Sequence, residues 1–111
     1  MDKTIGTIKD NDFRRMVLES DKPAVVDFWA QWCVPCKQLD TVLQEMALEY
    51  EGKVSFFKVD VNESNMTASR YAVRSLPMLL FFEGGEIVDQ AVGSLSREVL
   101  VDKLNRLLES S

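Results

Sequence analysis

Two cysteines, Cys33 and Cys36, are the residues of this chain best suited to covalent chemistry. They are the only cysteines among 111 residues, they stand two residues apart in Trp32-Cys33-Val34-Pro35-Cys36, and the chain contains no histidine. Two cysteines are too few for a framework of stabilising bridges, and a bridge that closes so short a loop removes little entropy from the unfolded chain. The spacing therefore indicates redox chemistry, with two incidental buried cysteines or half of a metal site as the alternatives.

The position of the pair predicts different roles for its two members. Cys33 is expected where a strand ends and a long helix begins, and the free N–H groups at a helix N-terminus stabilise a thiolate. Pro35 fits the first helical turn, where its missing N–H costs nothing. We expect an exposed Cys33 to attack the disulfide of a partner, and a shielded Cys36 to resolve the mixed disulfide. The product is a Cys33–Cys36 disulfide that a reductase must reopen.

Two charged residues interrupt apolar strands of the chain. Asp27 lies within the apolar run 24–29, where a carboxylate is costly to bury unless it is paired or protonated. It is a candidate proton acceptor for Cys36 through water, and the alternative is a strand-end aspartate bonded to the backbone. Lys58 interrupts the run 56–60 in the same way. It could pair with Asp27, or its amine could reach solvent.

Alternating secondary-structure elements are predicted to position these residues. Apolar periodicity and turn residues give the order β-α-β-α-β-α-β-β-α. Helices between the early strands imply parallel pairing there, and Gly84-Gly85 implies an antiparallel hairpin at the end. The predicted strands cover 3–8, 24–29, 54–61, 77–82 and 86–92, and the predicted helices follow caps at 10–12, 33, 62 or 64, and 96, the third reaching about residue 72.

Length predicts one domain over residues 1–111, which the order of elements makes an α/β domain, and 46% hydrophobic residues are enough to build its core. The net charge of −5 argues against nucleic acid and against an anionic membrane as partners. The longest apolar run, 76–82, is far shorter than the ~18 residues that span a bilayer, and residues 1–10 lack the apolar core of a secretory signal. We therefore expect a cytoplasmic protein in a reducing compartment, where an isolated Cys-x-x-Cys is redox-active or binds metal.

Several motifs together resemble the thioredoxin family over essentially the whole chain. The spacing of the cysteines alone would not be specific, whereas the combination is. The segments that carry the resemblance are the active-site run 27–37, the strand segment 58–62, the segment 71–77 that carries a cis-proline in the family, and 82–86 with 92–93 in the terminal hairpin.

The resemblance implies a thioredoxin fold, a central mixed β-sheet flanked by helices on both faces, and the activity of a general protein-disulfide reductase. It implies Cys33 as nucleophile, Cys36 as resolving thiol, Asp27 as its buried base and Lys58 as the neighbour of that base. It also implies a cis peptide before Pro77, although X-Pro bonds in folded proteins are cis only ~5–6% of the time.

The resemblance also implies how partners bind. The backbone of Leu76 would pair with the substrate as an added strand segment, within a flat apolar docking surface. The implied electron donor is a flavin-dependent, NADPH-using thioredoxin reductase, and the clients are disulfide-containing proteins. Beyond the cysteine pair we expect no cofactor and no metal, and we expect a monomer. The docking surface comprises Trp32, Val61, Leu76, Pro77, Val92 and Gly93.

The chain departs from the family pattern at three positions. Val34 stands where glycine is usual, and its β-branched side chain stiffens the turn and changes access to the nucleophile. Thr41 replaces a helix-kinking proline, so the long helix is expected to be straighter, and Met78 replaces a threonine. Pro35 matches the reducing members of the family. We expect Val34, Pro35 and Pro77 to tune the redox potential.

Two other hypotheses remain open on these residues. One is a specialised thioredoxin-like oxidoreductase with a dedicated partner or a shifted potential, which Val34 and Met78 would favour. The other is a non-enzymatic binding subunit or a zinc-bridged dimer. Because two cysteines without histidine supply only half of a zinc site, a metal would need two chains or added carboxylates.

Overall fold

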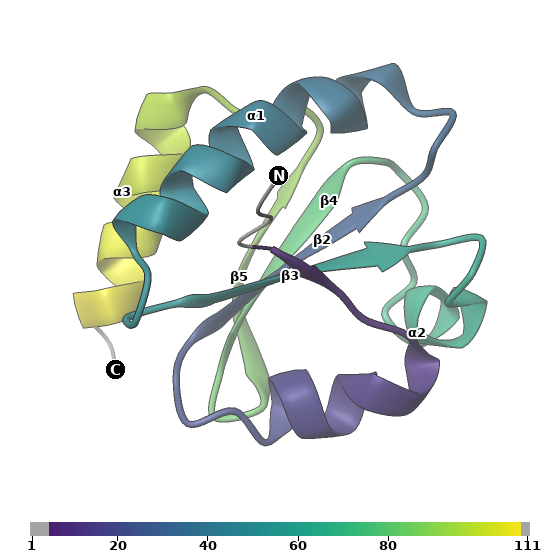
Figure 1. Ribbon diagram of the computed structural model, residues 1–111, viewed down its shortest axis with the longest axis horizontal. Helices are drawn as coiled ribbons and strands as arrows, with labels where there is room; N and C mark the ends of the chain where they lie inside the picture. The colour runs from purple at the N-terminus through teal and green to yellow at the C-terminus, as the bar shows by residue number, and fades with distance from the viewer. Residues whose placement is uncertain (1–4, 110–111) are drawn as a thin grey trace.

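The computed structural model describes residues 5–109, in which five strands form one mixed sheet in the order β1-β3-β2-β4-β5 (Figure 1). Strand boundaries agree with the predicted ones to within one or two residues, except that the predicted strand 3–8 shortens to a two-residue edge strand. Residues 3 and 4 of that prediction lie outside the described part. The strands are β1 Gly6–Thr7, β2 Ala24–Trp29, β3 Ser55–Asp60, β4 Met78–Glu83 and β5 Glu86–Val92, and the helices are α1 Val34–Glu49, α2 Asn65–Arg70 and α3 Arg97–Glu109.

Helices cover both faces of the sheet, as the resemblance implied. Figure 1 shows α1 and α3 together on one side of the strands, and the segment 10–18 with α2 on the other. The central strand β2 supplies side chains to both layers, because successive residues of a strand point to opposite faces. Val25 packs in the cluster with Leu43 of α1 and Leu104 of α3. Val26 packs instead in the opposite cluster, with Phe13 and other side chains of that layer.

Strand directions depend on the length of each crossover. β1, β2 and β3 are parallel as predicted, whereas β4 is antiparallel to β2, a direction that the alternation of elements did not predict. At 1.5 Å per residue the sixteen-residue α1 spans ~24 Å, which is enough to return the chain along a six-residue strand of ~20 Å. The six-residue α2 spans only ~9 Å. The chain therefore re-enters the sheet close to the end that it left, and β4 runs back.

The hairpin between β4 and β5 forms at the predicted glycines. Gly84 and Gly85 have φ of 60° and 84°, and Glu83 pairs with Glu86 across them. Positive φ at both central residues is the requirement of the two-residue turn that matches strand twist. A Cβ at Gly85 would also lie 2.9 Å from the carbonyl oxygen of Leu18. Glycine at this position therefore allows both the turn and the close approach of the segment 10–18.

The first predicted helix is not α-helical. Asp10–Asp12 form a 3₁₀ turn and Arg14–Leu18 a π-helix, which Glu19 N–H closes by bonding the Arg14 carbonyl at 2.9 Å. A wider turn suits a segment that directs Phe13, Val17 and Leu18 toward one hydrophobic cluster.

The sequence predicted that Asp10 would cap its own helix, but its carboxylate bonds a different helix. Its carboxylate accepts hydrogen bonds from Thr67 N–H at 2.8 Å, Thr67 Oγ1 at 2.6 Å and Met66 N–H at 3.3 Å. Burial raises the pKa of Asp10, but the bonds from Thr67 and Met66 outweigh it and lower the pKa. Asp10 thus caps α2, whose own cap residue Ser64 makes no side-chain hydrogen bond to the helix.

The long helix α1 buries the predicted face. Leu39, Leu43, Met46 and Ala47 are buried, and Val42 and Tyr50 pack against the same cluster. The helix is continuous through Thr41. None of the helices within residues 5–109 has the length and apolarity that a membrane span requires.

The last helix, α3, begins as predicted. Ser96 Oγ accepts the N–H of Val99 at 3.2 Å, which caps the helix. Leu100, Leu104 and Leu107 are buried, whereas Leu108 is only partly buried. These leucines hold α3 against the sheet beside α1.

Candidate active site

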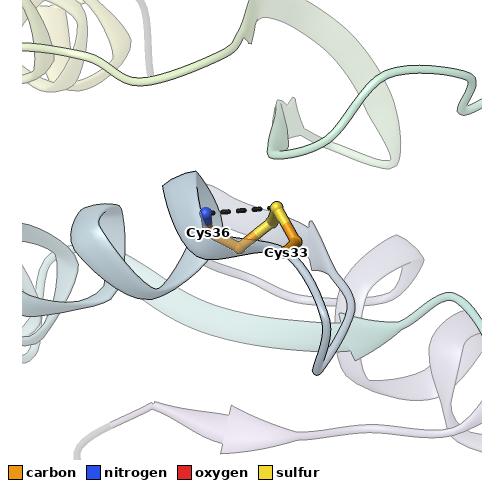
Figure 2. Close-up of a disulfide and its surroundings, with 2 residues drawn as sticks. All are labelled: Cys33 and Cys36. Atoms are coloured by element: carbon orange, nitrogen blue, oxygen red, sulfur yellow. Dashed lines mark hydrogen bonds between the residues drawn. A yellow bond between two sulfur atoms is a disulfide. The ribbon is translucent and has the colours of Figure 1, made fainter.

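The two cysteines lie where β2 ends and α1 begins (Figure 2). They form a disulfide, with Cα atoms 5.3 Å apart. Cys33 is the N-cap residue of α1, and its Sγ accepts the N–H of Cys36 at 3.2 Å, the dashed line in Figure 2. Pro35 lies in the first helical turn, where no N–H is needed. A thiolate on Cys33 would receive the same N–H together with the helix dipole.

Cys33 is less exposed than the sequence predicted. In the disulfide form it is 5% exposed and Cys36 is 2% exposed, whereas the flanking Trp32 and Val34 are 69% and 63% exposed. Cys33 is buried because its sulfur bonds Cys36 and accepts the N–H of that residue, while Val61 and Leu76 pack against the pair. The prediction of an exposed Cys33 is therefore wrong for this state, although the residue still borders an open groove.

An apolar groove of about 630 Å³ lies next to the disulfide. Three of the predicted docking residues line it, namely Trp32, Val61 and Leu76. Val61 and Leu76 also pack against the cysteines themselves. The remaining lining residues are Cys33, Val34, Pro35, Val73 and Arg74.

The other three predicted docking residues lie at the end of the β4–β5 pair and do not line this groove. The peptide before Pro77 is cis, as the resemblance implied. Pro77 is buried, and its carbonyl accepts the N–H of Gly93 at 2.8 Å. Val92 pairs with Met78 across the strands and is 54% exposed. The sequence did not indicate Val73 or Arg74, because loop residues carry no periodic pattern that predicts a groove.

Asp27 is a buried carboxylate without a partner. It is 2% exposed, and neither of its carboxylate oxygens has a hydrogen-bond partner. Burial raises its pKa to about 7, against the opposing effect of Lys58 and with a further increase from Asp40. It lies inside β2 and is not bonded to backbone, so the alternative of a backbone-bonded strand-end aspartate is wrong.

Lys58 does not pair with Asp27. The two residues are aligned on the adjacent strands β2 and β3, but Lys58 Nζ donates to Asp40 Oδ1 at 2.8 Å. It also lies 4.4 Å from the ring centroid of Trp29. Trp29 is itself only partly buried, with its indole N–H unpartnered.

Asp40 was not predicted as a site residue. Its signal is that it stands four residues after Cys36, and therefore on the same helical face. Among residues 5–109, no group of three or more His, Cys, Asp or Glu side chains could hold a metal ion.

Comparisons with known proteins agree with this geometry. The model of the thioredoxin family matches residues 4–106. The chain is 46% identical to Thioredoxin 2 of Chlorobaculum tepidum over 86% of its own length and 88% of the relative. It is 43% identical to Thioredoxin 1 of a Nostoc species, over 91% and 94% of the two chains. It is 46% identical to Thioredoxin C-2 of Corynebacterium nephridii, over 90% and 93%.

Proposed function

Because the chain belongs to the thioredoxin family and is a protein-disulfide reductase, we propose that Cys33 is its nucleophile and Cys36 its resolving thiol. The position of Cys33 at the N-cap of α1 supports this assignment above all, since it is the sulfur that accepts a helix N–H. Thioredoxins use their own cysteine pair as the redox group and need no bound cofactor.

The reaction exchanges one disulfide for another. The Cys33 thiolate attacks a client disulfide, forms a Cys33–client bond and releases the first client sulfur as a thiolate. Cys36 then gives its proton to Asp27 and attacks the Cys33 sulfur, so that the Cys33–Cys36 bond forms and the second client thiolate leaves. Two electrons pass from the dithiol to the client, and the two client thiolates take up protons from solvent and from Asp27.

Asp27 suits the role of proton acceptor. A general base works best when its pKa lies near the working pH, and burial raises the pKa of Asp27 to about 7. Its oxygens are free of other hydrogen bonds, so a water molecule between it and Cys36 would have an acceptor. Lys58 lies beside it on β3 and lowers the same pKa.

Clients bind across the groove and the adjoining end of the β4–β5 pair. The exposed apolar side chains of Trp32, Val34 and Val92 support a docking surface there, and the Leu76 backbone would pair with an extended client segment. Val34, Pro35 and Pro77 tune the cysteine pair, since the first two lie between the cysteines and Pro77 follows Leu76, which packs on them.

A flavin-dependent thioredoxin reductase regenerates the dithiol, and the protein works as a monomer in the cytoplasm as part of electron transport and redox homeostasis. A redox titration against glutathione buffers, read by tryptophan fluorescence and checked by thiol alkylation, tests the general reductase. A general reductase should show one two-electron transition at a potential more reducing than that of glutathione. A transition at a more oxidising potential than that of glutathione would favour the specialised oxidoreductase.

Single-turnover reduction of a disulfide-linked peptide tests the two cysteine roles. We expect the reduced protein to end as the Cys33–Cys36 disulfide with two free peptide thiols. Cys36→Ser should stop at a mixed disulfide, and Cys33→Ser should not react. Mass spectrometry at quenched time points separates the three products. A mixed disulfide on Cys36 in the Cys33→Ser protein, formed as fast as in Cys36→Ser, would reverse the assignment.

A further inference from the structure

Asp40 connects the long helix to the charged residue beside Asp27. It stands one helical turn after Cys36 on α1, and its Oδ1 accepts a hydrogen bond from Lys58 Nζ at 2.8 Å. The pair is partly buried, since the Lys58 and Asp40 side chains are 15% and 32% exposed. The ring of Trp29 provides the second contact of the ammonium, at 4.4 Å from its centroid.

Asp27 is the alternative partner for the same ammonium. It is aligned with Lys58 on the neighbouring strand, so both side chains project from the same face of the sheet. Both carboxylate oxygens of Asp27 lack a partner. The lysine stem is long and flexible, so its charge has two possible acceptors, of which Asp40 is the one used.

We propose that Asp40 is a positioning residue of the redox site, which holds the Lys58 ammonium against Trp29 and keeps it from pairing with Asp27. This inference rests on the proton-carrying role proposed for Asp27. A buried carboxylate that pairs directly with a cation stays ionised and is a weak base. By engaging Lys58, Asp40 leaves Asp27 able to accept the proton of Cys36 during resolution and to return it when the Cys33–Cys36 bond is reduced.

Other groups around Asp27 do not compete with this arrangement. Burial raises the pKa of Asp27, Lys58 lowers it and Asp40 raises it. On α1, which packs on the same face, Cys36 is a titratable thiol only in the reduced state. On the same face of the sheet, Leu79 lies opposite Asp27 on β4 and α3 contributes the buried leucines Leu100 and Leu104. The carboxylates of Asp60 and Asp89 on the adjoining strands are engaged, with Asn62 N–H and with Lys103.

The titration of the Asp27 carboxyl measures the effect of Asp40 directly. It is followed by ¹³C NMR in the oxidised protein, where the bridged cysteines do not titrate. We expect Asp40→Asn to lower the Asp27 midpoint by about one pH unit or more, because the lysine is released and a negative charge is lost. Asp40→Glu keeps the carboxylate and should leave the Asp27 midpoint close to that of the unsubstituted protein. Asp21→Asn, a matched change at an exposed residue before β2, should not move it.

The same substitution in a Lys58→Met background separates positioning from the simple loss of a charge. If Asp40 acts through Lys58, Asp40→Asn should shift the midpoint there by less than half as much. An equal shift in both backgrounds, or no shift in the folded Asp40→Asn protein, would overturn the inference. Asp40→Ser gives a second test if the asparagine variant folds poorly.

A kinetic measurement distinguishes failure of this inference from failure of the proposed function. The pH profile of mixed-disulfide resolution should move with the NMR midpoint in Asp40→Asn. If the midpoint moves and the rate profile does not, Asp40 controls Asp27 as inferred, but Asp27 is not the proton acceptor for Cys36.

Discussion

Asp27, the proposed proton acceptor, is a buried residue that costs stability as the pH rises. It is 2% exposed without a hydrogen-bond partner, and burial raises its pKa from 3.8 to about 7. Between pH 3.8 and about pH 7, the Asp27 carboxyl holds a proton in the folded protein that it has released in the unfolded chain. The stabilising contribution of the residue is therefore complete below about pH 4, declines as the pH rises, and is lost above about pH 7.

We predict that Asp27→Asn raises the free energy of unfolding at pH 8 by up to about 4 kcal/mol, because the asparagine cannot ionise. At pH 4 the two proteins should differ much less, since the carboxyl is then neutral in the folded protein and only about half ionised in the unfolded chain. Urea unfolding of the oxidised proteins across this range measures the difference. Asp21→Asn is the matched control and should show no such trend, and a pH-independent difference for Asp27→Asn would contradict the linkage.

At the scale of an element, the end of α2 shows that sequence patterns predict the boundary of a helix less well than its existence. The helix was predicted to reach about residue 72, but it ends at Arg70. Ala72 then adopts a left-handed conformation with φ of 54°, and Val73 N–H bonds the Ala68 carbonyl at 3.0 Å. Glycine is the usual residue at such a helix end. An alanine there gives no local signal that the helix stops.

We predict that Ala72→Gly stabilises the protein by about 1 kcal/mol, because glycine adopts this backbone conformation without steric cost. Ala72 is exposed, so the substitution removes little packing. Chemical denaturation of both proteins measures the gain. The control is Ser69→Gly, an exposed change within α2, which should destabilise by about 0.5 kcal/mol. A loss of stability for Ala72→Gly would contradict this account.

At the scale of the whole molecule, one hydrophobic cluster joins α1 and α3 to the sheet. Leu43 of α1 lies in it with Phe81 of β4 and Leu104 of α3. The same layer fixes the start of α1, and with it the position of Cys33 at the end of β2. Core packing on this face therefore supports both the fold and the geometry of the cysteine pair.

We predict that Leu43→Ala lowers the free energy of unfolding by 2–5 kcal/mol, within the range for buried leucines replaced by alanine. Leu43 is 1% exposed, whereas Leu48 on the same helix is 60% exposed. Leu48→Ala is the matched control and should change stability by less than about 0.5 kcal/mol. Equal losses for the two variants, measured by urea unfolding, would mean that α1 does not pack on the sheet through this face.

The sequence by itself determined the features that depend on local patterns. The Cys33–Cys36 pair, the buried character of Asp27, the face of α1 and the glycine hairpin each follow from a few neighbouring residues. Backbone geometry and side-chain periodicity act over that same short range. The motifs shared with the thioredoxin family added the fold and the cis peptide before Pro77, which local preferences alone oppose.

Only the tertiary structure decided the contacts between distant segments. Lys58 bonds Asp40, eighteen residues away, and Asp10 caps a helix more than fifty residues later. The antiparallel direction of β4 and the burial of Cys33 likewise depend on how complete elements pack. Lys58 and Asp10 each have several possible partners along the chain, and a partner is selected only when the elements come together in space. The environment of Asp27, with its unpartnered carboxylate and raised pKa, was decided at that level.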